Sequence, residues 1–146
     1  MREVNHFIGG EQVVGTSGRF GDIYNPNIGE VQARVALATE AEVAAAVENA
    51  KAALPTWAAT NPQRRARIMF EFKRLLEANM DELAELLSSE HGKVIADSRG
   101  DVQRGIDVVE FACGIPHLQK GEYTEGAGPG IDVYSMRQTM GDVAGI

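Results

Sequence analysis

Four successive segments between residues 39 and 113 repeat their apolar residues with the 3.6-residue period of amphipathic helices, and this pattern limits the fold more than any other feature. Residues that favour helix starts open the first three: Thr39 with Glu42, Asn61 with Pro62, and Asn79 with Glu82. We expect the first helix to end at Pro55, which lacks a backbone N–H, and the third to end at Gly92. The fourth runs from about residue 94 to Cys113.

Short segments typical of strands flank these helices. Residues 7–14 place two apolar pieces around a glycine pair, which predicts a hairpin, and residues 20–24 and 30–36 follow as further strands. After the helices, residues 131–138 are typical of a strand and residues 143–146 of the start of another. Strands, then helices, then strands predict an α/β class. Because four helices have so little sheet to cover, we expect some of their apolar faces to be exposed.

Apolar faces can be predicted for the second and the fourth helix. The second helix carries its apolar side chains at Ile68, Met69, Phe72, Leu75 and Leu76. The fourth helix carries them at Ile95, Val102, Ile106, Val109 and Cys113. Each set recurs at helical spacing, so each predicts the side of the helix that packs against another element.

The composition limits the class of protein. A net charge of −7 argues against a nucleic-acid partner, because phosphate backbones are bound by Lys and Arg. No apolar run approaches the roughly 20 residues of a membrane-spanning helix, and the first residues carry no signal-peptide pattern. The single cysteine cannot form an internal disulfide, which fits a reducing compartment. We expect a soluble cytoplasmic protein without nucleic-acid or membrane partners.

Several residues that could carry chemistry are better explained structurally. His6, His91 and His117 lie far apart without the spacing of metal ligands, so we expect no metal site. Cys113 lies on the apolar stripe of the fourth helix, where a buried inert thiol is commoner than a nucleophile. The glycines of residues 126–130 precede a strand and not a helix, so they predict a flexible connection and not a phosphate-binding loop.

Arg104 is the strongest candidate for a binding residue. It lies off the apolar stripe of the fourth helix, between Gly100 and Gly105. Glycine in a helix costs about 1 kcal/mol relative to alanine, and two glycines here would let a ligand or another backbone come close. The alternative is an exposed arginine that pairs with Asp101 or Asp107 at helical spacing, and the pattern alone favours this structural explanation.

The order of segments resembles the aldehyde dehydrogenase superfamily. The matching stretches are Phe7 to Glu11, Tyr24 to Glu30, Trp57 after the Ala-rich helix, Arg64 to Ile68, and Glu90-His-Gly-Lys93. Within that superfamily, residues 104–112 and the Gly-Ile-Pro that follows resemble methylmalonate-semialdehyde dehydrogenase most. One departure is Thr139-Met-Gly-Asp142, where the family commonly has Pro-Leu-Gly-Val. An aspartate in a buried strand is costly unless it is paired or lies near an edge.

The resemblance implies an activity. Members of that family oxidise methylmalonate or malonate semialdehyde with NAD and coenzyme A, lose carbon dioxide, and yield propionyl-CoA or acetyl-CoA without a metal. The resemblance also implies a homo-oligomer, and it assigns the substrate carboxylate to the arginine that matches Arg104. A guanidinium fork suits a carboxylate. Contacts to the cofactor are not assigned to particular residues.

The resemblance further implies that the catalytic groups lie beyond this chain. Cys113 matches no catalytic position, and the nucleophilic cysteine and oxyanion asparagine of the family come after the strand that residues 143–146 resemble. We therefore expect an N-terminal fragment that is inactive alone. Residues 1–120 would begin the NAD-binding domain, 121–140 would form the oligomerisation strand segment, and 141–146 would start the next NAD-domain strand.

Two alternatives remain open. The parent could act on another small semialdehyde, such as succinate semialdehyde. The chain could instead be a non-enzymatic module that associates with itself through an unpaired strand and exposed helix faces.

Overall fold

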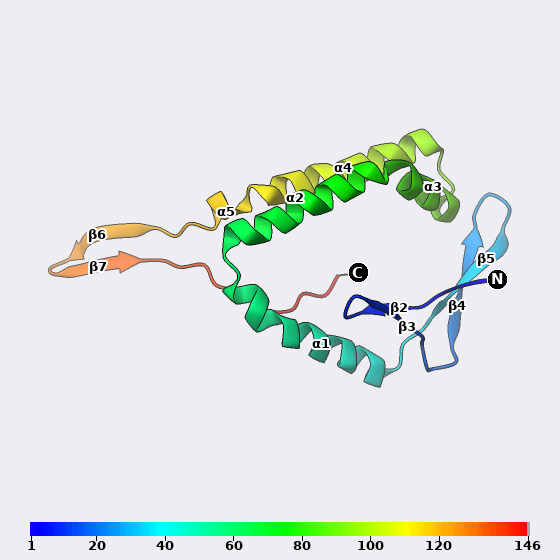
Figure 1. Ribbon diagram of the computed structural model, residues 1–146, viewed down its shortest axis with the longest axis horizontal. Helices are drawn as coiled ribbons and strands as arrows, with labels where there is room; N and C mark the ends of the chain where they lie inside the picture. Colours follow the sequence, from blue (N-terminus) through cyan, green and yellow to red (C-terminus); the bar gives the residue numbers. More distant parts are fainter. Residues whose placement is uncertain (146) are drawn as a thin grey trace.

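The helices of the computed structural model, which describes residues 1–145, lie along two sides of an open arrangement (Figure 1). The helices are α1 (Glu40–Ala59), α2 (Pro62–Ala78), α3 (Met80–His91), α4 (Ile95–Cys113) and α5 (Ile115–Leu118). In Figure 1, α2, α3 and α4 lie together along the top, whereas α1 runs alone along the bottom. No helix in the described part is long and apolar enough to span a membrane.

The strands form three small sheets. They are β1 (Arg2–Val4), β2 (His6–Ile8), β3 (Glu11–Val13), β4 (Phe20–Asn25), β5 (Glu30–Ala36), β6 (Tyr123–Gly128) and β7 (Ile131–Tyr134). One sheet has the order β1-β5-β4, and β2-β3 and β6-β7 form two-stranded antiparallel hairpins. The β6-β7 hairpin extends away from the helices at the left of Figure 1. Helices with short strands confirm the predicted α/β class.

The strands before the helices follow the predictions closely. The predicted hairpin is β2-β3, and its turn residues Gly9 and Gly10 both have positive φ, at 65° and 87°. Such angles match the twist of a two-residue hairpin loop and favour glycine. Strand β1 was not predicted. It pairs in parallel with β5, and a strand of three residues is too short to show an alternating pattern.

The first helix starts as predicted but continues past Pro55. The Thr39 side chain accepts a hydrogen bond from the Glu42 amide, and the Glu42 carboxylate accepts one from the Thr39 amide, which completes the capping box. The prediction that Pro55 ends the helix was wrong, because a proline φ is itself helical. The helix ends at Ala59, and the next residue, Thr60, caps it by donating its amide to the Thr56 and Trp57 carbonyl groups.

The second helix begins as predicted, whereas the predicted cap of the third is absent. The Asn61 side chain accepts a hydrogen bond from the Arg64 amide at 3.1 Å, and Pro62 is the first helical residue. Asn79 lies at the junction of α2 and α3, and its side-chain amide donates to the Leu75 carbonyl of α2 at 2.7 Å. Its side chain is therefore engaged at the end of α2 and does not cap α3.

The core is small and consists mostly of short side chains. Helix α4 packs against both α2 and α3, and its Ile106 is fully buried. The fully buried Ser98 hydroxyl lies 2.7 Å from the Ser88 hydroxyl of α3. Ala66 of α2 and Ala84 of α3 are also buried. Small side chains let the three helices approach closely, so the packing confirms the predicted stripe of α4, although Ile95 at its start is exposed.

Much apolar surface remains uncovered, as predicted. The accessible surface is 11138 Å² for a 15.7 kDa chain, against about 7,300 Å² for a compact monomer of this mass. Helix α1 has no buried residue. In α2 the predicted apolar face is divided: Met69 and Leu76 are partly buried, whereas Ile68, Phe72 and Leu75 are exposed.

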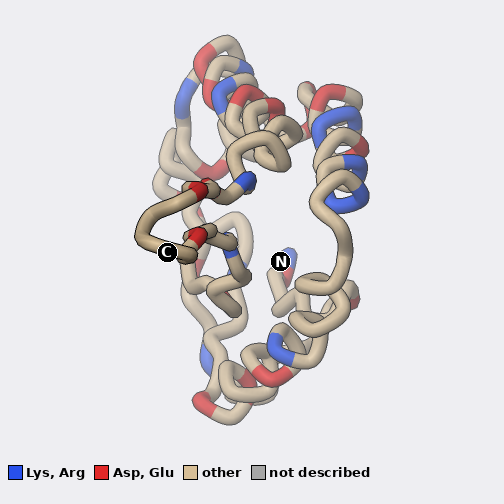
Figure 2. The backbone as a smooth tube through the Cα atoms, turned by 90° about the vertical axis from the view of Figure 1, so that its left-hand side faces the viewer, with Lys and Arg blue, Asp and Glu red and all other residues tan. Residues whose placement is uncertain are grey.

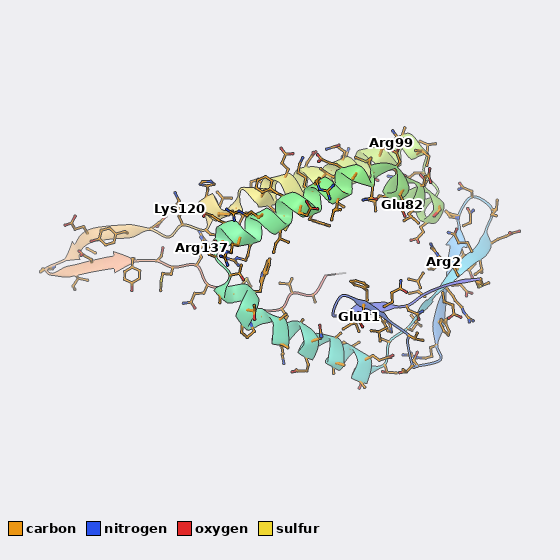
Figure 3. The ribbon with its side chains drawn as sticks, in the orientation of Figure 1. Arg2, Glu11, Glu82, Arg99, Lys120 and Arg137 are labelled. Atoms are coloured by element: carbon orange, nitrogen blue, oxygen red, sulfur yellow. The ribbon has the colours of Figure 1, made fainter. Side chains whose placement is uncertain are left out.

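Several charged side chains on the exposed helix faces form ion pairs. In Figure 2, Lys and Arg are interspersed with Asp and Glu along the upper helices. Arg74 contacts Glu71 at 2.6 Å within α2, and Arg99, which Figure 3 labels on α4, contacts Asp81 of α3 at 2.7 Å. Exposed pairs of this kind contribute about 0–1 kcal/mol each.

The segment after the helices differs most from the predictions. Residues 126–130 are not a loose connection: they complete β6 and its turn, and the Gly126 amide donates to the Asp132 carboxylate at 2.9 Å. The predicted strand over 131–138 ends at Tyr134. Residues 141–145 form no strand, and they pair with none of the described strands. Ile146, the last residue of the predicted final strand, lies outside the described residues.

We predict that Glu42→Gln weakens the pH dependence of stability in acid. The backbone hydrogen bonds from Thr39 and Thr16 lower the pKa of Glu42 from 4.5 to about 2. The carboxylate therefore stabilises the fold above about pH 4.5, and this contribution is lost as the pH falls toward 2. Urea unfolding followed by circular dichroism at pH 3, 4, 5 and 7 measures it. Parallel pH profiles of both proteins would contradict the prediction.

We predict that Gly121→Ala opens the base of the β6-β7 hairpin. A methyl group there would lie 1.7 Å from the Ser135 carbonyl oxygen, so the backbone must separate. The Ser135 amide, which donates to the Glu122 carbonyl at 2.9 Å, should then exchange its hydrogen faster. Gly105→Ala is the control, since its added methyl meets no atom within 4 Å and should stabilise α4 by about 0.5–1 kcal/mol. Unchanged exchange at Ser135 would contradict the prediction.

Candidate functional site

The candidate site is centred on Arg104, on the side of α4 that faces away from the core. Ile106 and Cys113 of the same helix are buried, whereas Arg104 is exposed. This difference follows from the 3.6-residue period, which places Arg104 nearly opposite the packed stripe. A methyl group added at Gly100 or Gly105 would meet nothing within 4 Å. The space beside the Arg104 backbone is therefore open to a ligand.

The two carboxylates that could pair with Arg104 are bound elsewhere. Asp101 and Asp107 lie three residues before and after it, the spacing at which helix side chains meet. Asp101 accepts a hydrogen bond from the Lys93 ammonium, with which it forms an ion pair. Asp107 accepts a hydrogen bond from the Gln103 amide at 2.9 Å. Within residues 1–145, Arg104 forms no ion pair, so the structure does not contain the predicted alternative pairing.

The charge of Asp101 is stabilised by its surroundings. Its pKa is lowered, first by the hydrogen bond from Lys93 and then by electrostatic attraction to Lys93, Arg104 and His91. The carboxylate is therefore ionised at neutral pH. Arg104 is close enough to influence Asp101 electrostatically without donating a hydrogen bond to it.

Apolar side chains lie on the same face of α4 as Arg104. Val108 and Phe111 follow it by four and seven residues, and they are 69% and 66% exposed. A guanidinium beside apolar side chains suits a small molecule with a carboxylate at one end and carbon groups next to it.

The remaining sequence candidates do not join this site. Cys113 is buried, as predicted, and lines a hollow of about 750 Å³ between α2, α4 and α5. His117 lines the same hollow, but no hydrogen bond to the Cys113 thiol is present among the described residues. His6 lies in β2, with its Nε2 atom 4.0 Å from Glu42 Oε1, and His91 ends α3. Residues 1–145 contain no group of three or more potential metal ligands.

The role of Lys93 was not recognised from the sequence. Lys93 and Asp101 are eight residues apart and belong to different elements, so no helical spacing relates them. The turn after α3, at Gly92 with φ of 84°, brings them together. The Glu90-His-Gly-Lys93 motif was the only available signal, and it did not indicate a partner.

The chain is similar to known proteins over its whole length. Residues 13–146 match the aldehyde dehydrogenase family. A malonate-semialdehyde dehydrogenase of Pseudomonas aeruginosa is 43% identical over all 146 residues, and an acylating mitochondrial methylmalonate-semialdehyde dehydrogenase of Arabidopsis thaliana is 45% identical over 98% of the chain. The chain spans 29% and 24% of the lengths of these two relatives.

The fold is also that of a solved relative. A crystal structure assigned to a methylmalonate-semialdehyde dehydrogenase of Sinorhizobium meliloti, in complex with NAD, superimposes with a TM-score of 0.94. The sequence identity is 64%, over 97% of this chain and 29% of that one. The family match covers nearly the whole chain and the fold agrees with the relative, so the chain belongs to the aldehyde dehydrogenase family, as the sequence motifs predicted.

Proposed function

We propose that this chain is the N-terminal part of an NAD-dependent, CoA-acylating methylmalonate- or malonate-semialdehyde dehydrogenase. The reaction converts the semialdehyde to propionyl-CoA or acetyl-CoA with loss of carbon dioxide. The observation that carries the proposal is the Arg104 guanidinium, which lies on an open face of α4 and forms no ion pair within residues 1–145. Relatives that match the chain over nearly its whole length are named for these two substrates.

In this proposal Arg104 binds the carboxylate of the semialdehyde. Its guanidinium can donate two parallel hydrogen bonds to the two carboxylate oxygens, which orients the substrate as well as binding it. Val108 lies one helical turn after Arg104 on the same face and would contact the carbon atoms next to the carboxylate. Selection for a carboxylated aldehyde would then depend on this face of α4.

Residues 1–145 do not contain the glycine-rich turn of the Rossmann dinucleotide-binding motif. In that motif the turn opens a helix, and backbone N–H groups meet the pyrophosphate. The glycines of residues 126–130 lie instead in the β6-β7 hairpin. We therefore assign no contact with NAD or coenzyme A to this chain. Support for these two groups comes from the S. meliloti complex with NAD and from the acylating A. thaliana relative.

The assembly and location of the protein stay predictions. A homo-oligomer is supported by the β6-β7 hairpin, which projects from the helices with Ile131, Val133 and Tyr134 exposed (Figure 1). The cytoplasmic location rests on the sequence alone. A different small semialdehyde, such as succinate semialdehyde, is the alternative substrate, and a non-enzymatic self-associating module is the alternative class.

We predict that Arg104→Met in the complete enzyme lowers kcat/KM for malonate semialdehyde about 10- to 100-fold. This range corresponds to the loss of a charge-assisted hydrogen bond. Activity with propanal, which has no carboxylate, should change less than about twofold because the residue is absent from the chemical step. Arg99→Met is the matched control on the same helix, since Arg99 is already paired with Asp81. Equal losses for both aldehydes would contradict the role of Arg104.

We also predict that residues 1–146 alone do not oxidise semialdehydes. Cys113 is the only cysteine, and it is buried on the packed side of α4, away from the Arg104 face. NADH formation, measured by absorbance with malonate semialdehyde, NAD and coenzyme A, should stay at the rate without protein. Turnover by the purified chain that is abolished by Cys113→Ser would overturn this assignment.

A further inference from the structure

Arg104 occupies a position where an arginine would ordinarily form an ion pair with a carboxylate of its own helix. Carboxylates three residues before and after an arginine lie on the same face of a helix, within reach of the guanidinium. Asp101 and Asp107 occupy these two positions. A guanidinium engaged by either carboxylate would have to give up that partner before it could bind a substrate carboxylate.

Lys93 competes with Arg104 for the first of these carboxylates, Asp101. Its ammonium group donates a hydrogen bond to Asp101 Oδ2, and its side chain is only 23% exposed, so the pair is partly sheltered from water. His91 is a further group that acts electrostatically on Asp101. Asp101 therefore has a cation of its own, and its attraction for Arg104 is partly neutralised.

The backbone at Gly92 places Lys93 at this position. Gly92 has a φ of 84°, which favours glycine, and it turns the chain from α3 toward α4. A methyl group on Gly92 would lie 2.8 Å from the Pro26 side chain in the turn between β4 and β5. Packing against that turn therefore holds the segment that carries Lys93.

Gln103 donates a hydrogen bond to the second carboxylate, Asp107. Its side-chain amide donates to Asp107 Oδ1 at 2.9 Å, across one turn of α4. The Gln103 amide is neutral, so it occupies an oxygen of Asp107 without cancelling the charge of that carboxylate. Lys93 is a cation, so removing Lys93 should affect Arg104 more than removing Gln103.

We propose that Lys93 is a positioning residue, which keeps Arg104 available to the substrate carboxylate by holding Asp101. This inference rests on the proposed function. Without Lys93, Asp101 would pair with Arg104 along the helix, and the substrate would compete with an internal carboxylate. Lys93 itself would not contact the substrate.

The charge arrangement can be tested without turnover. In the protein, the ¹⁵Nε–¹Hε signal of Arg104 reports whether its guanidinium is hydrogen-bonded, and Arg104→Lys identifies that signal. In Lys93→Met the signal should shift and its hydrogen should exchange more slowly. In the double variant Lys93→Met/Asp101→Asn it should return to the wild-type position. An Arg104 signal that is identical in wild type and Lys93→Met would overturn the proposal.

Controls separate this effect from a general loss of structure. Lys51→Met removes a lysine that is paired with Glu48 on α1, and it should leave the Arg104 signal unchanged. Asp101→Asn alone should also leave it unchanged, because Arg104 has no bond to Asp101 to lose. A shift of the Arg104 signal in Asp101→Asn equal to that in Lys93→Met would overturn the proposal, since it would show a structural change and not a new pair.

Kinetics of the complete enzyme test the consequence for the substrate. Lys93→Met should raise KM for malonate semialdehyde about two- to fivefold, the effect of one exposed ion pair, with kcat unchanged. Asp101→Asn should restore KM in the double variant, and KM for propanal should not change. A KM raised equally for both aldehydes, or not restored, would overturn the proposal. If Arg104→Met leaves KM for malonate semialdehyde unchanged, the proposed function itself fails. The Arg104 variant therefore tests the proposed function, whereas the Lys93 variant tests the role of Lys93.

Discussion

The packing of α4 against α2 and α3 determines the arrangement of everything that this chain contributes to a site. Ile106 and the small residues Ser98, Ala66 and Ala84 form the buried centre of this contact. Because the contact buries one side of α4, the other side must face outward, and that side carries Arg104. A substitution that rotated α4 would move Arg104, Val108 and Phe111 together. The position of the candidate site is thus a consequence of helix packing and not of a loop conformation.

The same packing also leaves much apolar surface of the helices exposed. Helices α2, α3 and α4 bury one another with short side chains, and α1 buries none of its own. Apolar residues such as Ile68, Phe72 and Leu75 remain exposed, and the total surface is roughly one and a half times that of a compact monomer. In a relative that is more than three times as long, further residues are present that could cover such faces. Arg104 and its neighbours form at most one wall of a site.

Within that wall, the distribution of charge is more informative than the presence of an arginine. Two carboxylates lie at helical spacing from Arg104, yet each accepts a hydrogen bond from another side chain: Asp101 from Lys93 and Asp107 from Gln103. A guanidinium without an internal partner can bind an external carboxylate at lower cost, because no existing hydrogen bond must break. The turn at Gly92, which packs against the β4-β5 turn, carries the Lys93 side chain that binds Asp101 of α4. This turn is thereby linked to the substrate binding proposed for Arg104.

The sequence alone was sufficient for the family, the α/β class, the positions of the four long helices and the capping box at Thr39, because each depends on residues close together in the chain. It also separated the buried Cys113 from the exposed Arg104, since both follow from helical period. The tertiary structure decided the rest. Strand β1 exists because β5 lies beside it, Asn79 is turned toward α2 and does not cap α3, and Lys93 reaches Asp101 across the Gly92 turn. These features depend on which distant groups meet in space, and no local pattern of residue types specifies that.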